Sequence, residues 1–176
     1  ARQRLKRVVF SEGEDERTLR AVQTVLDEGL AEPILIGRRE VILARAAEMG
    51  LRMDFSQSVQ IMDPAADEAA FAPLVTLYQH KVGRRGIPPA QAERNVRTRQ
   101  TVAAALMLEA GRADACLCGG TGDWFAHWHQ VFDVIGKRPE VARVYALSAL
   151  IVPNGHLFFV DTHLTVEPTP AQIVDM

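Results

Sequence analysis

The stretch ADACLCGGTGDWFAHWHQVFDVIG, residues 113–136, contains in order a short apolar run, a glycine-rich turn and an amphipathic segment. The run at 115–118 has the length and composition of a strand that is covered on both faces of a sheet. Gly119, Gly120 and Gly122 allow a sharp turn and a close approach to bare peptide N–H groups. Because ligands of open α/β sheets bind beyond the carboxyl ends of strands, this turn is the first candidate for a binding site.

The same glycines also fit a second interpretation, in which they only make a strand–helix connection tight. Their spacing matches neither the GxGxxG dinucleotide pattern nor a Walker loop, which needs a Lys in a fixed place. The turn alone therefore leaves both interpretations open.

Upstream of the turn, apolar runs alternate with helical patterns, which predicts a parallel sheet with right-handed crossovers. The predicted strands are residues 7–10, 33–37 and 59–62. The predicted helices run from Gly13 to Gly29, from Arg38 to Met49, from about 67 to 79, and as one long helix from 88 to 110.

Charged residues at two helix starts bear on anion binding. Glu14, Asp15 and Glu16 occupy the start of the first helix, where they complement the helix dipole but repel a phosphate. A dinucleotide site at that first turn is therefore not expected. The front half of the long helix carries Arg97 among three arginines, which indicates either a solvated helix end or a patch that faces an anion.

The pattern changes after residue 143. Two apolar runs, 145–152 and 156–161, are joined by Pro-Asn-Gly, which predicts a β-hairpin. We expect a first α/β lobe over residues 1–143 and the start of a second lobe over residues 144–176. The chain begins without Met in a basic segment, residues 1–6, and ends in a helix that starts at Thr169, so we expect a fragment of a longer polypeptide.

Composition narrows the functional classes. Hydrophobic residues make up 48% and the net charge is −2, so neither nucleic acid nor a membrane surface is an expected partner. No apolar run approaches the about 20 residues of a membrane span. The two cysteines, Cys116 and Cys118, are expected to be free thiols of a reducing cytosol, and we predict a cytoplasmic protein. His127 and His129 point about 200° apart on a helix, so no metal site with these thiols is expected.

Several stretches in this order resemble the phosphotransacetylases (phosphate acetyl/butyryltransferases). They are RVVFSEGEDERTLRAV from Arg7, LAEPILIGRREVI from Leu30, GRADACLCGG from Gly111, and VIGKRPEVARVYALSALIV followed by LFFVDTHLTVEPTPAQIVD. The resemblance implies a three-layer α/β/α fold with a mostly parallel sheet, like that of the isocitrate and isopropylmalate dehydrogenases, in which a second lobe is inserted.

Within this family the chain most resembles the C-terminal half of two-part, NADP-dependent malic enzymes. True phosphotransacetylases carry Ser-Thr-Ala and then a phosphate-holding Arg after the central turn. This chain has Asp123-Trp124-Phe125 and His129 there, and the family's catalytic Asp and Ser-Arg pair match no position before Met176. No catalytic residue is therefore assigned, and we expect no phosphotransacetylase activity from this chain by itself.

The resemblance implies a regulatory and oligomerisation domain that binds acetyl-CoA and inhibits malate decarboxylation by a malic-enzyme domain in the same polypeptide. NADP and Mg²⁺ or Mn²⁺ would bind that other domain, and no cofactor is expected in this chain. The candidate acetyl-CoA residues are Gly119, Gly120, Thr121, Trp124, His129 and Arg97. Two alternatives stay open, an active phosphate acyltransferase and a purely structural dimerisation module.

Overall fold

The computed structural model describes residues 5–176, so the first four residues of the basic segment 1–6 lie outside the described residues. Two compact units divide the chain, one ending at Gly136 and the other beginning at Lys137. Residues 137–146 carry no helix or strand, and the boundary predicted at residue 143 lies in this segment. Each unit is described by itself.

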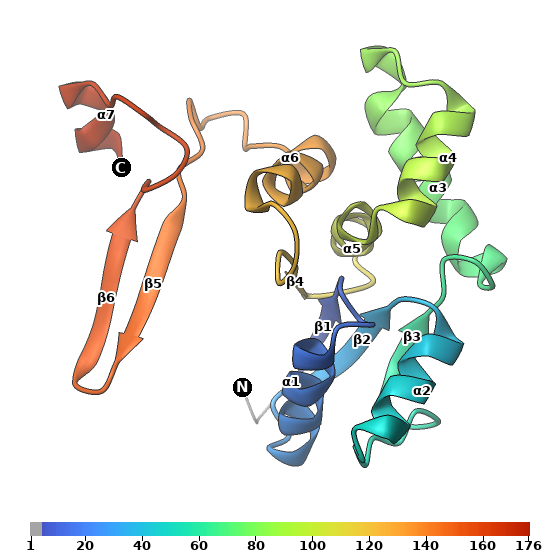
Figure 1. Ribbon diagram of the computed structural model, residues 1–176. Coiled ribbons are helices and arrows are strands. Elements are labelled where there is room, and N and C mark those ends of the chain that lie inside the picture. The colour runs from blue at the N-terminus through green and yellow to red at the C-terminus, as the bar shows by residue number, and fades with distance from the viewer. Residues whose placement is uncertain (1–4) are drawn as a thin grey trace. The chain divides into compact units, whose positions relative to one another are not determined.

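The first unit is built on a parallel four-stranded sheet with the strand order β3-β2-β1-β4 (Figure 1). In register, Val9 lies opposite Ile34 on one side and Cys116 on the other. The strands are β1 (Arg7–Phe10), β2 (Glu32–Ile36), β3 (Gln60–Met62) and β4 (Ala115–Leu117). The four strands predicted from the sequence are thereby confirmed to within one residue at each end.

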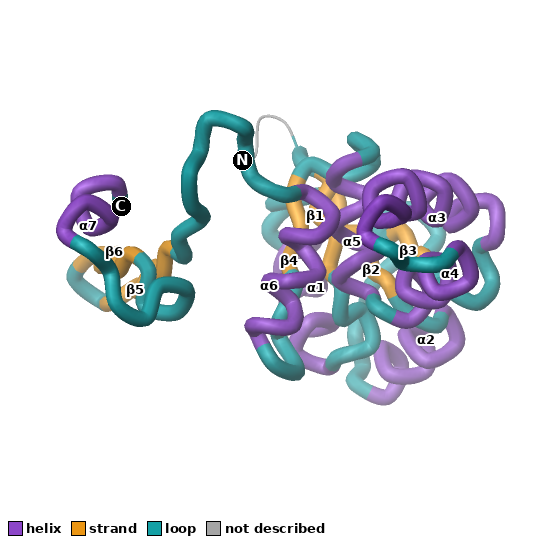
Figure 2. The backbone as a smooth tube through the Cα atoms, turned by 90° about the horizontal axis from the view of Figure 1, so that it is seen from above, coloured by secondary structure: helices purple, strands orange, loops and turns teal. Residues whose placement is uncertain are grey.

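Helices cover both faces of this sheet, which confirms the predicted three-layer α/β/α architecture (Figure 2). One face packs against α1 (Glu16–Asp27) and α2 (Arg39–Glu48). The opposite face packs against α3 (Glu68–Val82), α4 (Pro89–Thr98), α5 (Gln100–Glu109) and α6 (Trp124–Ile135), with the short 3-10 helix η1 (Gly83–Arg85) after α3.

Neighbouring residues of a strand belong to different hydrophobic cores, because successive side chains point to opposite faces. Val9 is fully buried with α5 and α3, whereas Phe10 is buried with α1 and α2. Strand β2 repeats the alternation, with Leu35 in the core that contains Phe10 and Ile36 in the core that contains Val9. The continuous apolar runs of β1 and β2 therefore fill two separate cores.

The single helix predicted over residues 88–110 is wrong, because the chain breaks it at Arg99. The backbone of Arg99 is extended (φ −110°, ψ 91°), and it separates α4 from α5 without a proline or glycine. Helix α4 is amphipathic, while every residue of α5 from Thr101 to Met107 is buried. Because of the break, α5 can be buried while α4 keeps one exposed face. Tertiary packing of α5 therefore outweighs the local helix propensity at Arg99.

The prediction that β4 is covered on both faces is also wrong. Leu117 is 55% exposed, Ala115 is exposed, and only Cys116 packs against a core. The reason is the strand's position at the edge of the described sheet, where β1 is its one partner. A short apolar run has the same composition at an edge as in the centre of a sheet.

The second unit contains an antiparallel hairpin, as predicted. Strands β5 (Leu147–Val152) and β6 (Gly155–Val160) pair so that Val152 lies opposite Gly155, which leaves Pro153 and Asn154 as the two-residue loop. Helix α7 (Pro170–Asp175) follows, and Thr169 caps it in a reciprocal capping box with Gln172. Apolar side chains on both faces of the hairpin are exposed.

We predict that Gly13→Ala destabilises the first unit by about 1–3 kcal/mol. A Cβ at Gly13 would lie 2.7 Å from the Ile36 carbonyl oxygen and 3.0 Å from the Leu35 Cβ, where β1 leads into α1 beside β2. Gly83→Ala is the matched control, because its Cβ would meet nothing within 4 Å. Urea denaturation measures both free energies of unfolding, and equal values would contradict the close packing at Gly13.

Candidate functional site

The candidate site lies at the carboxyl edge of the parallel sheet, between β1 and β4. From β1 the chain crosses to β2 and β3 on one side, and β4 then pairs with β1 on the other side. This reversal is the topological switch point at which open α/β sheets bind ligands. The backbone N–H of Ser11 donates to the Leu117 carbonyl at 3.0 Å and so holds the two strand ends together.

A carboxylate from the β1 end occupies the glycine turn. The Gly119 N–H donates to Glu12 Oε1 at 2.9 Å, and the Glu12 side chain is only 12% exposed. The turn therefore binds an anion that belongs to the protein itself. One of the peptide N–H groups that the sequence pattern offered to a ligand is already satisfied.

His127 on α6 joins three elements around this carboxylate. Its Nε2 lies 2.8 Å from the Thr121 carbonyl oxygen, which only accepts, so Nε2 carries a proton. In the neutral ring Nδ1 is then the acceptor for the Thr101 hydroxyl at 2.7 Å. Glu12 Oε1 lies 3.8 Å from the same Nδ1. The imidazole thus fixes the turn to the buried helix α5.

The turn is held from its other side by α1. Arg17 donates from Nη2 to the Gly120 carbonyl at 2.7 Å and also pairs with Asp15. Gly119 and Gly122 both have φ of +82°, a conformation that side chains rarely adopt. The φ of Gly120 lies outside the left-handed region, and a Cβ there would meet nothing within 4 Å. Gly120 is therefore the one glycine of the turn with open space above it.

A carboxylate of the chain also occupies the N-terminus of α6. Asp123 caps the helix, and its side chain accepts the Ala126 N–H at 3.0 Å. This carboxylate occupies the helix N-terminus, the position where a phosphate would otherwise be favoured. Behind it Trp124 is 40% exposed, and the rings of Phe125, Trp128 and Phe132 stack along one side of α6.

His129 is poorly placed to donate a hydrogen bond to a ligand in its neutral form. Its Nδ1 lies 2.9 Å from the Phe125 carbonyl and must donate to it, so the neutral ring leaves Nε2 as an acceptor only. The ring also lies edge-on to Phe125 and Trp128. A donor toward solvent exists only when His129 is protonated.

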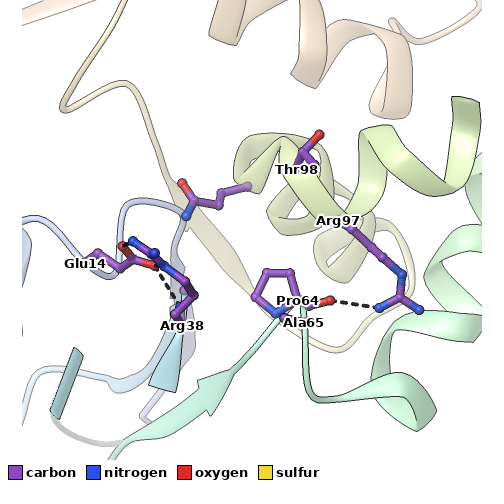
Figure 3. A pocket seen from close by; sticks show the side chains of 8 residues that line it. Glu14, Arg38, Pro64, Ala65, Arg97 and Thr98 are labelled. Atoms are coloured by element: carbon purple, nitrogen blue, oxygen red, sulfur yellow. Dashed lines mark hydrogen bonds and ion pairs between the residues drawn. The ribbon is translucent and has the colours of Figure 1, made fainter. Parts of the chain in front are cut away.

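Arg97 lies in a different cavity from the glycine turn. Figure 3 shows its guanidinium reaching the Pro64 carbonyl, a hydrogen bond of 2.8 Å, on the far side of the pocket from Glu14 and Arg38. This cavity of about 430 Å³ is open at the carboxyl ends of β2 and β3. Arg97 also pairs with Glu68 and Glu93, so a phosphate would compete with two carboxylates for it.

Glu14 and Arg38 close the other side of the same cavity. Arg38 donates to both oxygens of Glu14, from Nε at 3.0 Å and from Nη2 at 2.8 Å. These hydrogen bonds and the charge of Arg38 hold the pKa of Glu14 below its usual value, although burial opposes the shift. The Arg38 charge is therefore committed to a neighbour rather than offered to a ligand.

Three of the six candidate residues, Gly119, Gly120 and Thr121, lie in the turn itself. Trp124 and His129 follow on α6, and Arg97 lies in a different cavity. Sequence reasoning missed Glu12, Arg17, Thr101 and His127 as parts of this site. One signal for Glu12 was available. Glu12 lies two residues after β1 and Gly119 lies two residues after β4, and parallel strands end at the same edge of a sheet. Within residues 5–176 no cluster of three or more His, Cys, Asp or Glu side chains is suited to a metal ion.

The fold and the switch-point turn define an open-sheet α/β protein, a class in which ligands bind beyond the carboxyl ends of the strands. The family model described as phosphate acetyl/butaryl transferase matches residues 1–176, and the chain belongs to this family. The resemblance found in the sequence is thereby confirmed.

No helix among the described residues is long and apolar enough to span a bilayer.

Relatives of two kinds match the chain. Over 95% of its own length, the chain is 42% identical to the NAD-dependent malic enzyme of Rhizobium meliloti. Over its whole length, it is 38% identical to the NADP-dependent malic enzyme of Escherichia coli. It covers only 22% and 23% of those proteins. The phosphate acetyltransferase of Clostridium acetobutylicum is 30% identical, and the chain covers 53% of it.

Solved structures agree with the fold. The EutD phosphotransacetylase from Staphylococcus aureus matches with a TM-score of 0.79 at 23% identity, over 97% of this chain and 50% of that one. A phosphotransacetylase from Streptococcus pyogenes matches with a TM-score of 0.77 at 22% identity, over 97% and 51%. At these identities the likeness concerns the fold alone.

We predict that Glu12→Ala speeds amide hydrogen exchange at Gly119 about tenfold, because the lost charged hydrogen bond is worth on the order of 1.5 kcal/mol. Glu12→Gln is the matched control, since its amide oxygen still accepts from the Gly119 N–H. Exchange followed by NMR measures the effect. Equal exchange in all three proteins would contradict the contact between Glu12 and the turn.

Proposed function

We propose that this chain is the phosphotransacetylase-like regulatory and assembly part of a malic enzyme, and that it binds acetyl-CoA as an inhibitor. One observation carries the proposal. Four malic enzymes are 37–42% identical to nearly the whole chain, which matches 22–23% of each, and a fifth is 27% identical, while three phosphate acetyltransferases are 24–30% identical. Oxidative decarboxylation of malate, with its nucleotide and divalent metal, is assigned to another part of the same cytoplasmic polypeptide.

We propose NADP as the nucleotide of the parent malic enzyme. The relatives do not decide between the two nucleotides, because they include an NAD-dependent and several NADP-dependent malic enzymes. The chain's own residues do not bear on the choice. The nucleotide and metal sites belong to the proposed malic-enzyme domain.

The charges at the turn support a regulatory rather than a catalytic role. Glu12 occupies the Gly119 N–H and Asp123 occupies the start of α6, so two carboxylates stand where an inorganic phosphate substrate would need donors. An active phosphate acyltransferase is the second candidate, favoured by the 30% identity to the Clostridium acetobutylicum enzyme. Acetyl-CoA formation from acetyl phosphate and CoA at about 1 per second or faster would favour it.

The geometry favours the acyl end of the effector beside the turn. A polar cavity of about 200 Å³ lies there, lined by residues that include Glu12, Arg99, Thr121 and His127. Such a volume is below the about 300 Å³ at which drug-sized ligand pockets begin, so it suits a small group such as an acetyl thioester. The nucleotide end would then extend toward more open surface, which includes Trp124.

We predict that Gly120→Val raises the acetyl-CoA concentration needed for half-inhibition of malate oxidation at least tenfold, about 1.4 kcal/mol. Gly120 lines a neighbouring cavity of about 300 Å³ on the Arg17 side of the turn, so the valine would obstruct an effector that extends from the polar cavity across the turn. Gly83→Val is the matched control, since it also adds a side chain in open space but lies after α3. Inhibition assays on the polypeptide that carries both domains measure the effect.

Two outcomes of these assays would contradict different parts of the proposal. Unchanged inhibition in a folded Gly120→Val protein would place the ligand elsewhere. No inhibition of the unsubstituted enzyme by acetyl-CoA would reject the regulatory role itself and leave the structural module.

We propose that the hairpin contributes to a homo-oligomer, because its apolar side chains are exposed on both faces. Ile151 is 78% and Phe158 is 63% exposed, and both lie on one face of the β5–β6 pair. Exposed apolar surface of this kind marks an interface. Ile151→Asp with Phe158→Asp should therefore convert the oligomer to a smaller species in light scattering at micromolar concentration.

Val166→Asp is the control for this pair, because Val166 is 94% exposed but lies outside both strands. It should leave the oligomer intact. An unsubstituted chain that is already a monomer at that concentration would refute the assignment of the hairpin.

A further inference from the structure

Arg99 is an unfavourable residue for its position in the chain. It is the N-cap residue of α5, and its side chain forms no capping hydrogen bond. Ser, Thr, Asp and Asn are preferred at this position, and a cation there is unfavourable because the N-terminus of a helix carries a partial positive charge. Natural proteins break such local rules mainly at functional sites. The stability of α5 therefore does not account for the charge of Arg99.

The guanidinium of Arg99 is not used by the rest of the described chain. Within residues 5–176 it forms no hydrogen bond and no ion pair, and the residue is exposed. Arg97, two residues earlier, is held by Glu68 and Glu93. A guanidinium has five N–H donors and no acceptor. The donors of Arg99 are therefore available to a ligand, whereas those of Arg97 are largely committed.

Arg99 lines the polar cavity of about 200 Å³ beside the glycine turn. The carboxylate of Glu12 lines the same cavity, and its Oε1 accepts the Gly119 N–H. No ion pair joins Arg99 to Glu12, so a cation and an anion line one cavity without neutralising each other. Hydroxyl and amide side chains make up most of the remaining lining, namely Thr98, Gln100, Thr101, Thr121 and Gln130.

A neutral hydrogen-bond acceptor suits this pair of charges better than an anion does. An anion in so small a cavity would approach Glu12 as well as Arg99, and the Glu12 side chain is only 12% exposed, so solvent screens its charge weakly. A carbonyl oxygen accepts from a guanidinium without bringing a net charge. Hydrogen bonds from a charged donor are also stronger than those between neutral groups.

We propose that Arg99 is a specificity-determining residue of the acetyl-CoA site, where its guanidinium donates a hydrogen bond to the carbonyl oxygen of the thioester. The inference rests on the proposed function, in which the acyl end of the effector lies beside the glycine turn. Free CoA has a thiol in place of the thioester, so Arg99 has no carbonyl oxygen to bind. The domain would therefore respond to acetylated CoA rather than to the total amount of CoA.

The test measures the binding of acetyl-CoA and of CoA by isothermal titration calorimetry, with the polypeptide that carries both domains. We expect the unsubstituted protein to bind acetyl-CoA about tenfold more tightly than CoA. Arg99→Met keeps a long side chain without a donor, so it should weaken acetyl-CoA binding about tenfold and change CoA binding less than about twofold. Arg99→Lys should keep part of the preference, because it retains a cationic donor.

Arg94→Met is the matched control, because Arg94 is also exposed but lies on α4 and lines a different cavity. It should leave the ratio of the two affinities unchanged. Equal weakening of acetyl-CoA and CoA in Arg99→Met would overturn the assignment to the carbonyl and place a phosphate group at Arg99 instead. Equal affinities of the unsubstituted protein for both compounds, or no effect of Arg99→Met, would also overturn it.

Assays of malate oxidation with the same proteins separate this inference from the proposed function. Preferential binding of acetyl-CoA without inhibition would reject the regulatory role and leave the assignment of Arg99 intact. Inhibition whose preference for acetyl-CoA over CoA survives in Arg99→Met would reject Arg99 alone. No binding of acetyl-CoA to the unsubstituted protein would overturn both. Circular dichroism checks that each variant is folded.

Discussion

Helix α5 has no exposed face between Thr101 and Met107, and the architecture of the first unit depends on that constraint. A helix buried on all sides must be covered by several neighbours. The sheet packs against one side of α5, and α3, α4 and α6 cover the other sides. Burial of each large aliphatic side chain contributes about 1.5–3 kcal/mol, far more than the helix propensity lost at one residue. The extended backbone at Arg99 is the local consequence.

The same buried helix organises the candidate site. Thr101 is the polar residue in its buried run, and its hydroxyl meets His127, which in turn holds the Thr121 carbonyl. The glycine turn is thereby fixed to the core from one side and to Glu12 from another. A turn that already contains its own carboxylate is arranged in advance, and a free anion would have to displace Glu12 to reach the Gly119 N–H.

The sequence predicted most of the fold, because the strands of the first unit are continuous apolar runs that turn residues end sharply. It predicted the location of the turn for the same reason. The break at Arg99 could not be predicted, since neither Pro nor Gly marks it and only the surrounding packing requires it. The exposure of Leu117 was missed because an edge strand and a central strand have the same composition.

The site was predicted only as far as residues adjacent in sequence allow. Gly119 to Trp124 form one segment, whereas Glu12 joins them through a hydrogen bond across 107 residues. Such a contact follows from strand order, which the sequence does not state. Arg97 was assigned to a ligand because its charge was visible, but its partners Glu68 and Pro64 come from other elements.

The alternation of Val9 and Phe10 between two cores limits how this chain can change over time. A residue inserted or deleted within β1 would exchange every side chain beyond it between the two cores, and the alternate set would no longer fit. Gains and losses of single residues should therefore accumulate in connections such as the segment between α2 and β3, while β1 and β2 keep a constant length among descendants of this chain.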